Sequence, residues 1–114
     1  MLPFRKRLTL QQRTNEYARI KQKCPAYIPV ICEKHRREDP DLDREKFLVP
    51  MDLTAAQLLF VLRKRMHLNR DQAVFLFVDN TLVTGSTTLQ SIQSIRPSED
   101  GFLYVQYSLE NTFG

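Results

Sequence analysis

The spacing of apolar positions along the chain changes several times, and each change predicts a new element. Short apolar runs of strand type occur at residues 28–32, 46–50, 74–78 and 102–107. The uninterrupted run at 74–78 predicts a central strand. Pro29 has no amide hydrogen to donate, so it predicts an edge, a bulge or an unpaired side within the first run. The polar segment 33–45, with a turn signal at 39–41, predicts a hairpin between the first two strands.

Helical signals lie on both sides of that hairpin. Pro3 suits the first turn of a short helix, and residues 10–23 predict a second helix that ends before Pro25. Its apolar positions are sparse, so we expect it on the outside of the domain. Thr54 and Gln57 have the form of a capping box and open a helix that runs to about Met66.

The apolar residues of this third helix form a wide stripe. Ala55, Leu59, Leu62 and Met66 follow helical spacing and are expected to face the core. Leu58 and Val61 lie beside that stripe, which predicts either deep packing or a surface groove. The segment 87–90 repeats the capping-box form and predicts a short helix through residue 95.

The order of elements is two helices, then β-β-α-β-(short α)-β. This order predicts an α+β protein with a ubiquitin-like β-grasp, in which a helix crosses a four-stranded mixed sheet after two N-terminal helices. We expect one domain over residues 1–114, with a helical extension (1–24), a body (25–109) and a flexible tail (110–114). The tail ends in Gly114, which has no Cβ and leaves a terminal carboxyl sterically open.

Composition agrees with a globular chain and excludes several classes. Hydrophobic residues make up 42% and charged residues 26% of the 114 positions, which suffices for one core without disulfides. The longest apolar runs are far shorter than the roughly 20 residues of a spanning helix, and no signal-peptide pattern begins the chain. Cys24 and Cys32 form no CxxC pair and are expected to be reduced, which favours the cytoplasm.

The net charge of +4 is unevenly distributed. Residues 1–23 contain seven Lys or Arg and one acid, whereas residues 73–114 contain one Arg and four acids. This asymmetry is typical of a solvated helix face or of an arm that meets acidic lipid or an acidic protein tail. Nucleic acid is a third, less favoured partner, because no recognisable reading motif accompanies the charge.

We find no sign of catalytic or metal chemistry in the sequence. His35 and His67 have no ligand partners at metal spacing, and no nucleophile, phosphate loop or carboxylate pair is recognisable. The sequence therefore predicts neither an enzyme nor a cofactor.

An ordered set of segments carries a family resemblance over nearly the whole chain, from about Phe4. The chain resembles the autophagy-related ubiquitin-like modifiers of the GABARAP and microtubule-associated light-chain group, and is most similar to GABARAP. The matching segments are 28–31, 33–34, 41–43, 46–50, 52–54, 63–65, 75–78, 102–104 and the Phe113–Gly114 end.

The resemblance implies a modifier that is conjugated to a lipid. A cysteine protease trims such proteins to a terminal glycine, and activating and conjugating enzymes attach that glycine to phosphatidylethanolamine. The lipidated form sits on autophagosomal membranes and recruits cargo receptors through short aromatic-x-x-aliphatic motifs. Carried over to this chain, the conjugation residue is Gly114.

The resemblance also implies two hydrophobic pockets beside an exposed edge strand, residues 46–50. The first pocket takes the aromatic residue and is lined by Glu16, Ile20, Pro29, Lys46, Leu48 and Phe102. The second pocket takes the aliphatic residue and is lined by Phe47, Val49, Pro50, Leu53, Leu58 and Val61. Lys46 and Arg63 are expected to meet the acidic residues that flank such ligands.

Three departures from the family pattern are visible. Tyr27 stands where a basic residue is common, Cys24 replaces an aromatic residue before Pro25, and residues 83–85 replace a proline-containing loop. An alternative function is an unconjugated peptide-binding adaptor that links vesicles to microtubules, with tubulin as the partner of the basic N-terminal helices.

Overall fold

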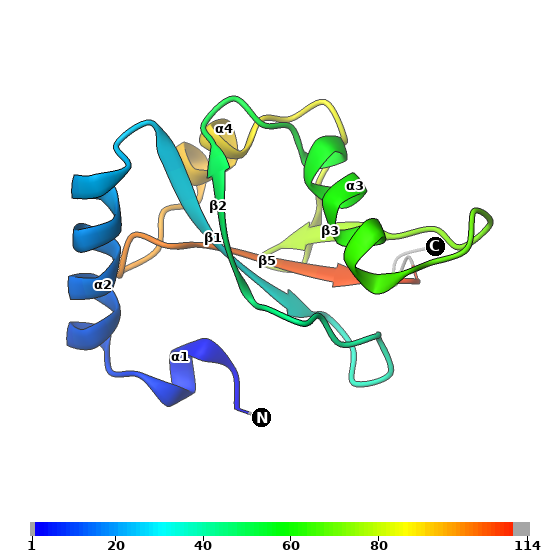
Figure 1. Cartoon of the computed structure of the whole chain (residues 1–114), viewed down its shortest axis with the longest axis horizontal. Coiled ribbons are helices and arrows are strands. Elements are labelled where there is room, and N and C mark those ends of the chain that lie inside the picture. The colour runs from blue at the N-terminus through cyan, green and yellow to red at the C-terminus, as the bar shows by residue number, and fades with distance from the viewer. Residues whose placement is uncertain (1, 111–114) are drawn as a thin grey trace.

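Five strands form one mixed sheet with the order β2-β1-β5-β3-β4, in a computed structural model that describes residues 2–110 (Figure 1). The elements are α1 (Phe4–Arg7), α2 (Leu10–Lys23), β1 (Tyr27–Lys34), β2 (Lys46–Pro50), α3 (Ala55–Met66), β3 (Phe75–Val78), β4 (Thr81–Leu82), α4 (Leu89–Ile95) and β5 (Leu103–Ser108).

The pairing of the strands confirms the predicted β-grasp. β1 is antiparallel to β2 and parallel to β5, while β3 is antiparallel to both β5 and β4. The sheet has one strand more than the four predicted, because the turn at Asp79 and Asn80 returns the chain as the two-residue strand β4. Both turn residues have positive φ, 50° and 62°, as a two-residue hairpin of this hand requires.

One sequence expectation about strand positions needs correction, and another is narrowed. β3 is not the central strand, because β5 occupies the middle of the sheet with β1 on one side and β3 on the other. Pro29 lies on a strand that is paired on both sides, so of its three predicted settings the unpaired side is the one found. The parallel ladder with β5 begins only at Val30, one residue after Pro29, so the missing amide falls outside that ladder.

α3 begins where its capping signal predicts, and α2 begins with a capping box that the sequence analysis did not identify. Thr54 and Gln57 make the expected reciprocal capping box of α3, and Thr9 makes another with Gln12 at the start of α2. The cap of α4 lies one residue later than predicted, at Thr88, whose hydroxyl accepts from the amide of Ser91. No helix in residues 2–110 is long and apolar enough to cross a bilayer.

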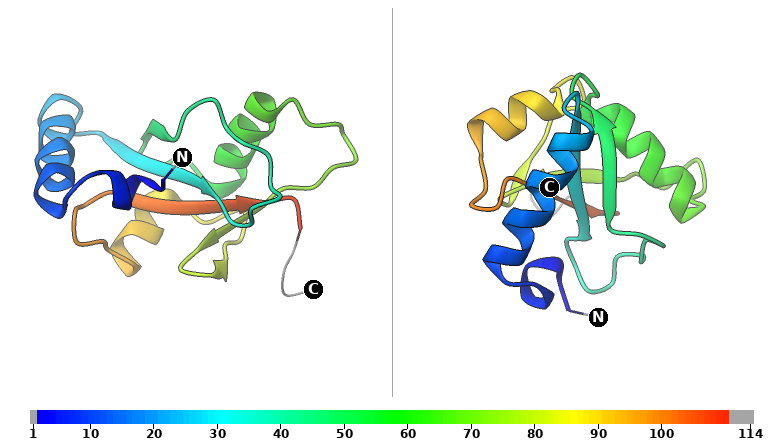
Figure 2. Two further views of the ribbon diagram at one scale, coloured as in Figure 1. Left: turned by 90° about the horizontal axis from the view of Figure 1, so that it is seen from below. Right: turned by 60° about the vertical axis from the view of Figure 1, so that its left-hand side comes forward.

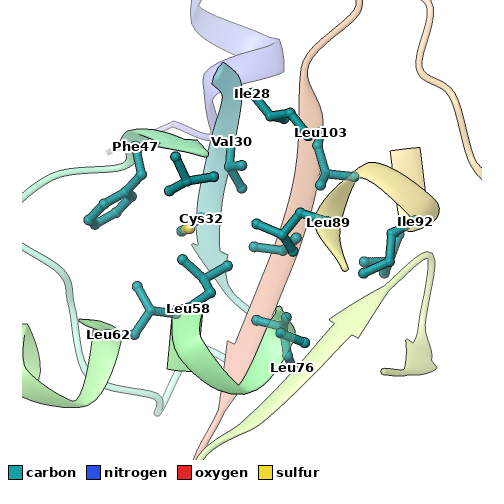
Figure 3. Packing of buried hydrophobic residues seen from close by; sticks show 14 of the residues in the cluster. Ile28, Val30, Cys32, Phe47, Leu58, Leu62, Leu76, Leu89, Ile92 and Leu103 are labelled. Atoms are coloured by element: carbon teal, nitrogen blue, oxygen red, sulfur yellow. The ribbon is translucent and has the colours of Figure 1, made fainter. Parts of the chain in front are cut away.

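Helices cover both faces of the sheet, so strand residues alternate between two apolar clusters. Val30 and Cys32 of β1 belong to the main cluster, and Figure 3 shows Leu58 and Leu62 of α3 on that same side. Ile31 points to the other face, where a second cluster lies beneath the N-terminal helices. Figure 2 shows α2 at one end of the molecule and α3 toward the other. The members of the second cluster are Phe4, Ile31, Phe102 and Tyr104, with Leu8, Tyr17 and Ile20 packed against it.

The loop between β1 and β2 is fastened to the end of β5 by a buried carboxylate. Asp39 accepts hydrogen bonds from the amides of Arg36, at 2.7 Å, and Leu109, at 3.0 Å, and from the hydroxyl of Ser108, at 3.0 Å. Burial would raise the pKa of Asp39, but these hydrogen bonds and the charge of Arg36 offset it and hold the pKa below its usual value.

Asp39→Asn is therefore expected to lose a pH-dependent part of the stability. The pKa is lower in the folded than in the unfolded chain, so the carboxylate stabilises the fold above the unfolded value of about 3.9, and this contribution disappears as the pH falls through the folded pKa. Urea unfolding at several pH values should show the variant less stable than the parent at pH 7, with the gap closing below about pH 4. A gap that stays constant over this range would contradict the account.

Candidate functional site

β2 is an edge strand, as the sequence analysis predicts. It pairs with β1 alone among residues 2–110, so its outer side offers unpaired backbone groups. Phe47 and Val49 turn into the main cluster, whereas Leu48 points to the opposite face and is 45% exposed. An exposed edge of this kind can accept an extended peptide as an additional strand.

The residues predicted for the first pocket come from β1, β2, α2 and the position just before β5, and several of them meet where β2 faces α2. Lys46 of β2 pairs with Glu16 of α2, and Leu48 lies opposite Pro29 in the β1–β2 ladder. Phe102 is only 1% exposed and belongs to the cluster against which Ile20 packs, so its role as a pocket residue stays a prediction. The residues predicted for this site are Glu16, Ile20, Pro29, Lys46, Leu48 and Phe102.

The charge of Lys46 lies in a crowded setting. Burial and the nearby charge of Arg7 lower the pKa of Lys46. Its ammonium group also lies 5.6 Å from the centre of the Phe4 ring, a cation–π contact. A single ammonium group therefore contacts α2 and the N-terminal helix at one end of the edge strand.

The second set of predicted residues lies between β2 and α3. Phe47, Val49 and Leu53 belong to or pack against the main cluster, and Val61 is exposed on the outer side of α3. Phe47, Val49 and Leu58 are all buried, at 6%, 8% and 0% exposed, so their part in a pocket stays a prediction. The width of the α3 stripe at Leu58 therefore reflects deep packing, and of the two helix residues only Val61 presents surface to a groove.

A cavity of about 450 Å³ adjoins this second region and contains residues that the sequence analysis missed. Phe60 is 60% exposed, and the ammonium group of Lys64 lies 4.5 Å from the centre of its ring. Phe60 lies within the uninterrupted apolar run 58–62, so the sequence pattern gives no signal that its side chain points outward. The residues around the cavity are Asp43, Phe60, Val61, Lys64, Arg65 and His67.

The guanidinium of Arg63 is occupied by hydrogen bonds within the protein. Its two terminal nitrogens donate to the main-chain carbonyls of Gln72 and Asn69, the latter at 2.8 Å. The side chain therefore braces the loop after α3, and its role as a ligand contact stays a prediction. Arg65 pairs with Asp43 at 2.8 Å, which links α3 to the β1–β2 loop.

Gly114 lies outside the residues that the structure describes, as does most of the predicted tail. Glu110, the first tail residue, forms a 2.9 Å ion pair with Arg36. Among residues 2–110, no three His, Cys, Asp or Glu side chains gather closely enough to hold a metal ion.

Comparison with known proteins identifies the family. The model of the family described as "Autophagy protein Atg8 ubiquitin like" matches residues 12–114. The chain belongs to the Atg8 family. It is 47% identical over 112 residues to autophagy-related protein 8 of Mycosarcoma maydis, with 97% of this chain and 95% of the relative covered.

Other comparisons agree in sequence and in structure. Autophagy-related protein 8d of Arabidopsis thaliana is 46% identical, with 97% of this chain and 93% of that protein covered. The crystal structure of Trypanosoma brucei ATG8 superposes with a TM-score of 0.89 at 39% identity, covering 100% of this chain and 99% of the other. The protein is therefore an autophagy ubiquitin-like modifier, and its family consists of modifiers and adaptors rather than enzymes.

Proposed function

We propose that this Atg8-family chain is conjugated through Gly114 to phosphatidylethanolamine and then recruits proteins carrying aromatic-x-x-aliphatic motifs to the autophagosomal membrane. The observation that carries the binding half of the proposal is the unpaired outer edge of β2, beside the exposed side chain of Leu48. The family match, which extends to residue 114, supports the conjugation half. The unconjugated protein resides in the cytoplasm.

The covalent step transfers the acyl group of Gly114 from oxygen to sulfur to nitrogen. The terminal carboxylate attacks the α-phosphorus of ATP and displaces pyrophosphate, and a cysteine thiolate of the activating enzyme then displaces AMP. After exchange to the conjugating enzyme, the amine of the lipid attacks the thioester and expels the thiolate, with loss of a proton. The resulting amide adds two acyl chains, each of whose buried CH₂ groups contributes about 0.8 kcal/mol, which gives stable anchoring.

A reconstituted conjugation reaction tests this half directly. The chain is incubated with activating and conjugating enzymes, ATP and liposomes containing phosphatidylethanolamine, and conversion is followed as a faster-migrating band. Conversion should need ATP and the lipid amine, so liposomes of phosphatidylcholine alone serve as the control. Gly114→Ala is expected to convert poorly, because a side chain is introduced next to the reacting carbonyl. Full conversion of that variant would contradict the role of Gly114.

The peptide site is tested by combining two substitutions on β2. Lys46→Glu with Leu48→Ala removes the exposed apolar contact and reverses the charge that faces acidic ligand residues, so affinity for an aromatic-x-x-aliphatic peptide with upstream acids should fall at least about tenfold. Isothermal titration calorimetry measures the change.

A matched control for this pair exists on α2. Leu10 is as exposed as Leu48, at 44%, and Lys23 is an exposed lysine. Lys23→Glu with Leu10→Ala therefore makes the same chemical changes away from β2 and should leave peptide affinity unaltered. Equal losses of peptide affinity in both double variants, or no loss in either, would contradict the assignment of the peptide site to β2.

A second candidate function rests on the exposed basic side chains of the N-terminal helices. Lys6, Arg19 and Lys23 take part in none of the ion pairs found within residues 2–110. They would suit the acidic tails of tubulin and an adaptor that works without conjugation. Arg19→Glu with Lys23→Glu should then abolish co-sedimentation with microtubules at moderate salt, and unchanged sedimentation would dismiss this candidate.

Binding to RNA or DNA with a steep salt dependence would instead favour the nucleic-acid alternative.

A further inference from the structure

The end of β5 is fastened to the β1–β2 loop by a group of side chains that the peptide site does not use. Arg36, Asp39 and Ser108 form this group, which we call the tail-base clamp. Asp39 Oδ1 accepts from the amide of Leu109 and from the hydroxyl of Ser108, both at 3.0 Å. The guanidinium of Arg36 donates to Ser108 Oγ at 3.3 Å and to Glu110 Oε2 at 2.9 Å.

The backbone around the clamp is fixed by further hydrogen bonds. The hydroxyl of Tyr107 donates to the carbonyl of Pro40 at 2.6 Å, and the amide of His35 donates to the carbonyl of Tyr107 at 2.8 Å. The amide of Glu110 donates to Ser108 Oγ at 3.2 Å. Both ends of the loop segment 35–40 are therefore bonded to the residues that follow the centre of β5.

The burial of Asp39 suggests a purpose beyond stability. Its side chain has no exposed surface, and a buried charged pair often stabilises a fold no more than apolar packing would. What this carboxylate does, and an apolar side chain could not, is hold the amide of Leu109 in one direction. Four residues follow Glu110, so covalent geometry alone limits the Gly114 carboxyl to about 14 Å from that residue.

We propose that Asp39, supported by Arg36, is a positioning residue for conjugation, because it fixes where the reactive C-terminal segment leaves the folded body. This inference rests on the proposed conjugation through Gly114. An activating enzyme that binds the folded body would then find the reactive segment starting at a fixed position, directly after Glu110. If the clamp opens, Leu109 and Glu110 lose their fixed positions as well. Binding to the enzyme must then order these two residues, and this loss of conformational entropy weakens binding.

The test measures thioester formation on the activating enzyme as a function of chain concentration. Asp39→Ala should raise KM about tenfold while kcat changes less than about twofold, because the lost order must be restored on binding and the chemistry is untouched. Asp39→Asn retains an acceptor for the amide of Leu109 and should recover part of the loss. Asp41→Ala is the matched control, because Asp41 lies two residues further along the same loop, is 84% exposed and pairs with Lys34.

Hydrogen exchange at the amides of Leu109 and Glu110 provides a readout of the clamp itself. Exchange should accelerate in Asp39→Ala and stay as in the parent in Asp41→Ala. Faster exchange with an unchanged KM would overturn the positioning role, and unchanged exchange would show that Asp39 does not hold the segment. A parent chain that forms no thioester at all would instead refute the proposed conjugation, and this inference with it.

A milder variant covers the case in which Asp39→Ala fails to fold, as judged by loss of peptide binding at β2. Arg36→Gln leaves the bond from Leu109 to Asp39 in place but removes the ion pair with Glu110. It should raise KM about threefold, with faster exchange at Glu110 than at Leu109. An unchanged KM in a folded Arg36→Gln protein with faster exchange at Glu110 would also overturn the proposal.

Discussion

Replacing Gly101 by alanine is expected to destabilise the protein by about 3 kcal/mol or more. Gly101 has a φ of +97°, where residues with a side chain are strained, and an added Cβ would overlap the ring of Tyr17. That ring packs edge-on against Phe102, with 5.6 Å between ring centroids, so it cannot move aside freely. The strain must therefore distort the loop before β5 or push α2 away from the sheet. Urea unfolding gives the free-energy difference.

Gly85→Ala is the matched control for this substitution. Gly85 lies outside the left-handed φ region, and its added Cβ would meet only Ala56, whose Cβ lies at 3.2 Å and Cα at 3.9 Å. It should cost about 1 kcal/mol or less. Gly101→Ala should also weaken peptide binding, because Ile20 shares α2 with Tyr17, whereas Gly85→Ala should not. Equal stability losses in the two glycine variants would contradict the packing argument.

Asp100→Ala should have an effect of similar size, a loss of about 3–5 kcal/mol. The carboxylate is buried and accepts from the hydroxyl of Tyr104 and from the amide of Phe102 at 2.9 Å, and it lies 3.4 Å from Nε of Arg13. Its removal leaves the charge of Arg13 buried and uncompensated, at a nitrogen that already has no hydrogen-bond partner. Thermal and urea unfolding both measure the loss.

A double-mutant cycle separates the charge effect from simple loss of packing. Arg13→Met with Asp100→Ala removes both charges, so the double variant should be no less stable than Asp100→Ala alone. If the stability losses of Arg13→Met and Asp100→Ala add instead, the two residues are not energetically coupled. The cost of Asp100→Ala then lies in the lost hydrogen bonds. Glu99→Ala changes the neighbouring, exposed acid and should have little effect.

Local signals in the sequence were sufficient for most of the fold. The capping box at Thr54, the helix stop before Pro25 and the strand run 46–50 each depend on neighbouring residues, and each element formed where it was predicted. The β2 edge also follows from the order of elements, because a β-grasp leaves the second strand of the hairpin on the outside of the sheet.

Features that depend on distant contacts could not be predicted in this way. Leu58 lies three residues after Ala55 and four before Leu62, nearer the helix stripe than Val61 does, but only packing against the sheet decides that Leu58 is buried and Val61 is exposed. The pairing of β4 needs two residues alone, too few for a periodic signal. The bond between Asp39 and Leu109 joins residues 70 positions apart, so the turn signal at 39–41 carried no hint of it.

The burial of Phe4 under the short helix α1 makes the first turn of the protein a point of vulnerability. Arg5, Lys6 and Arg7 follow it directly and are exposed. A trypsin-like protease that cut there would release Phe4 and uncover the aromatic rings of Phe102 and Tyr104 on an otherwise intact sheet. The cleaved protein would expose an apolar aromatic surface. Loss of a few residues would therefore make the protein self-associate.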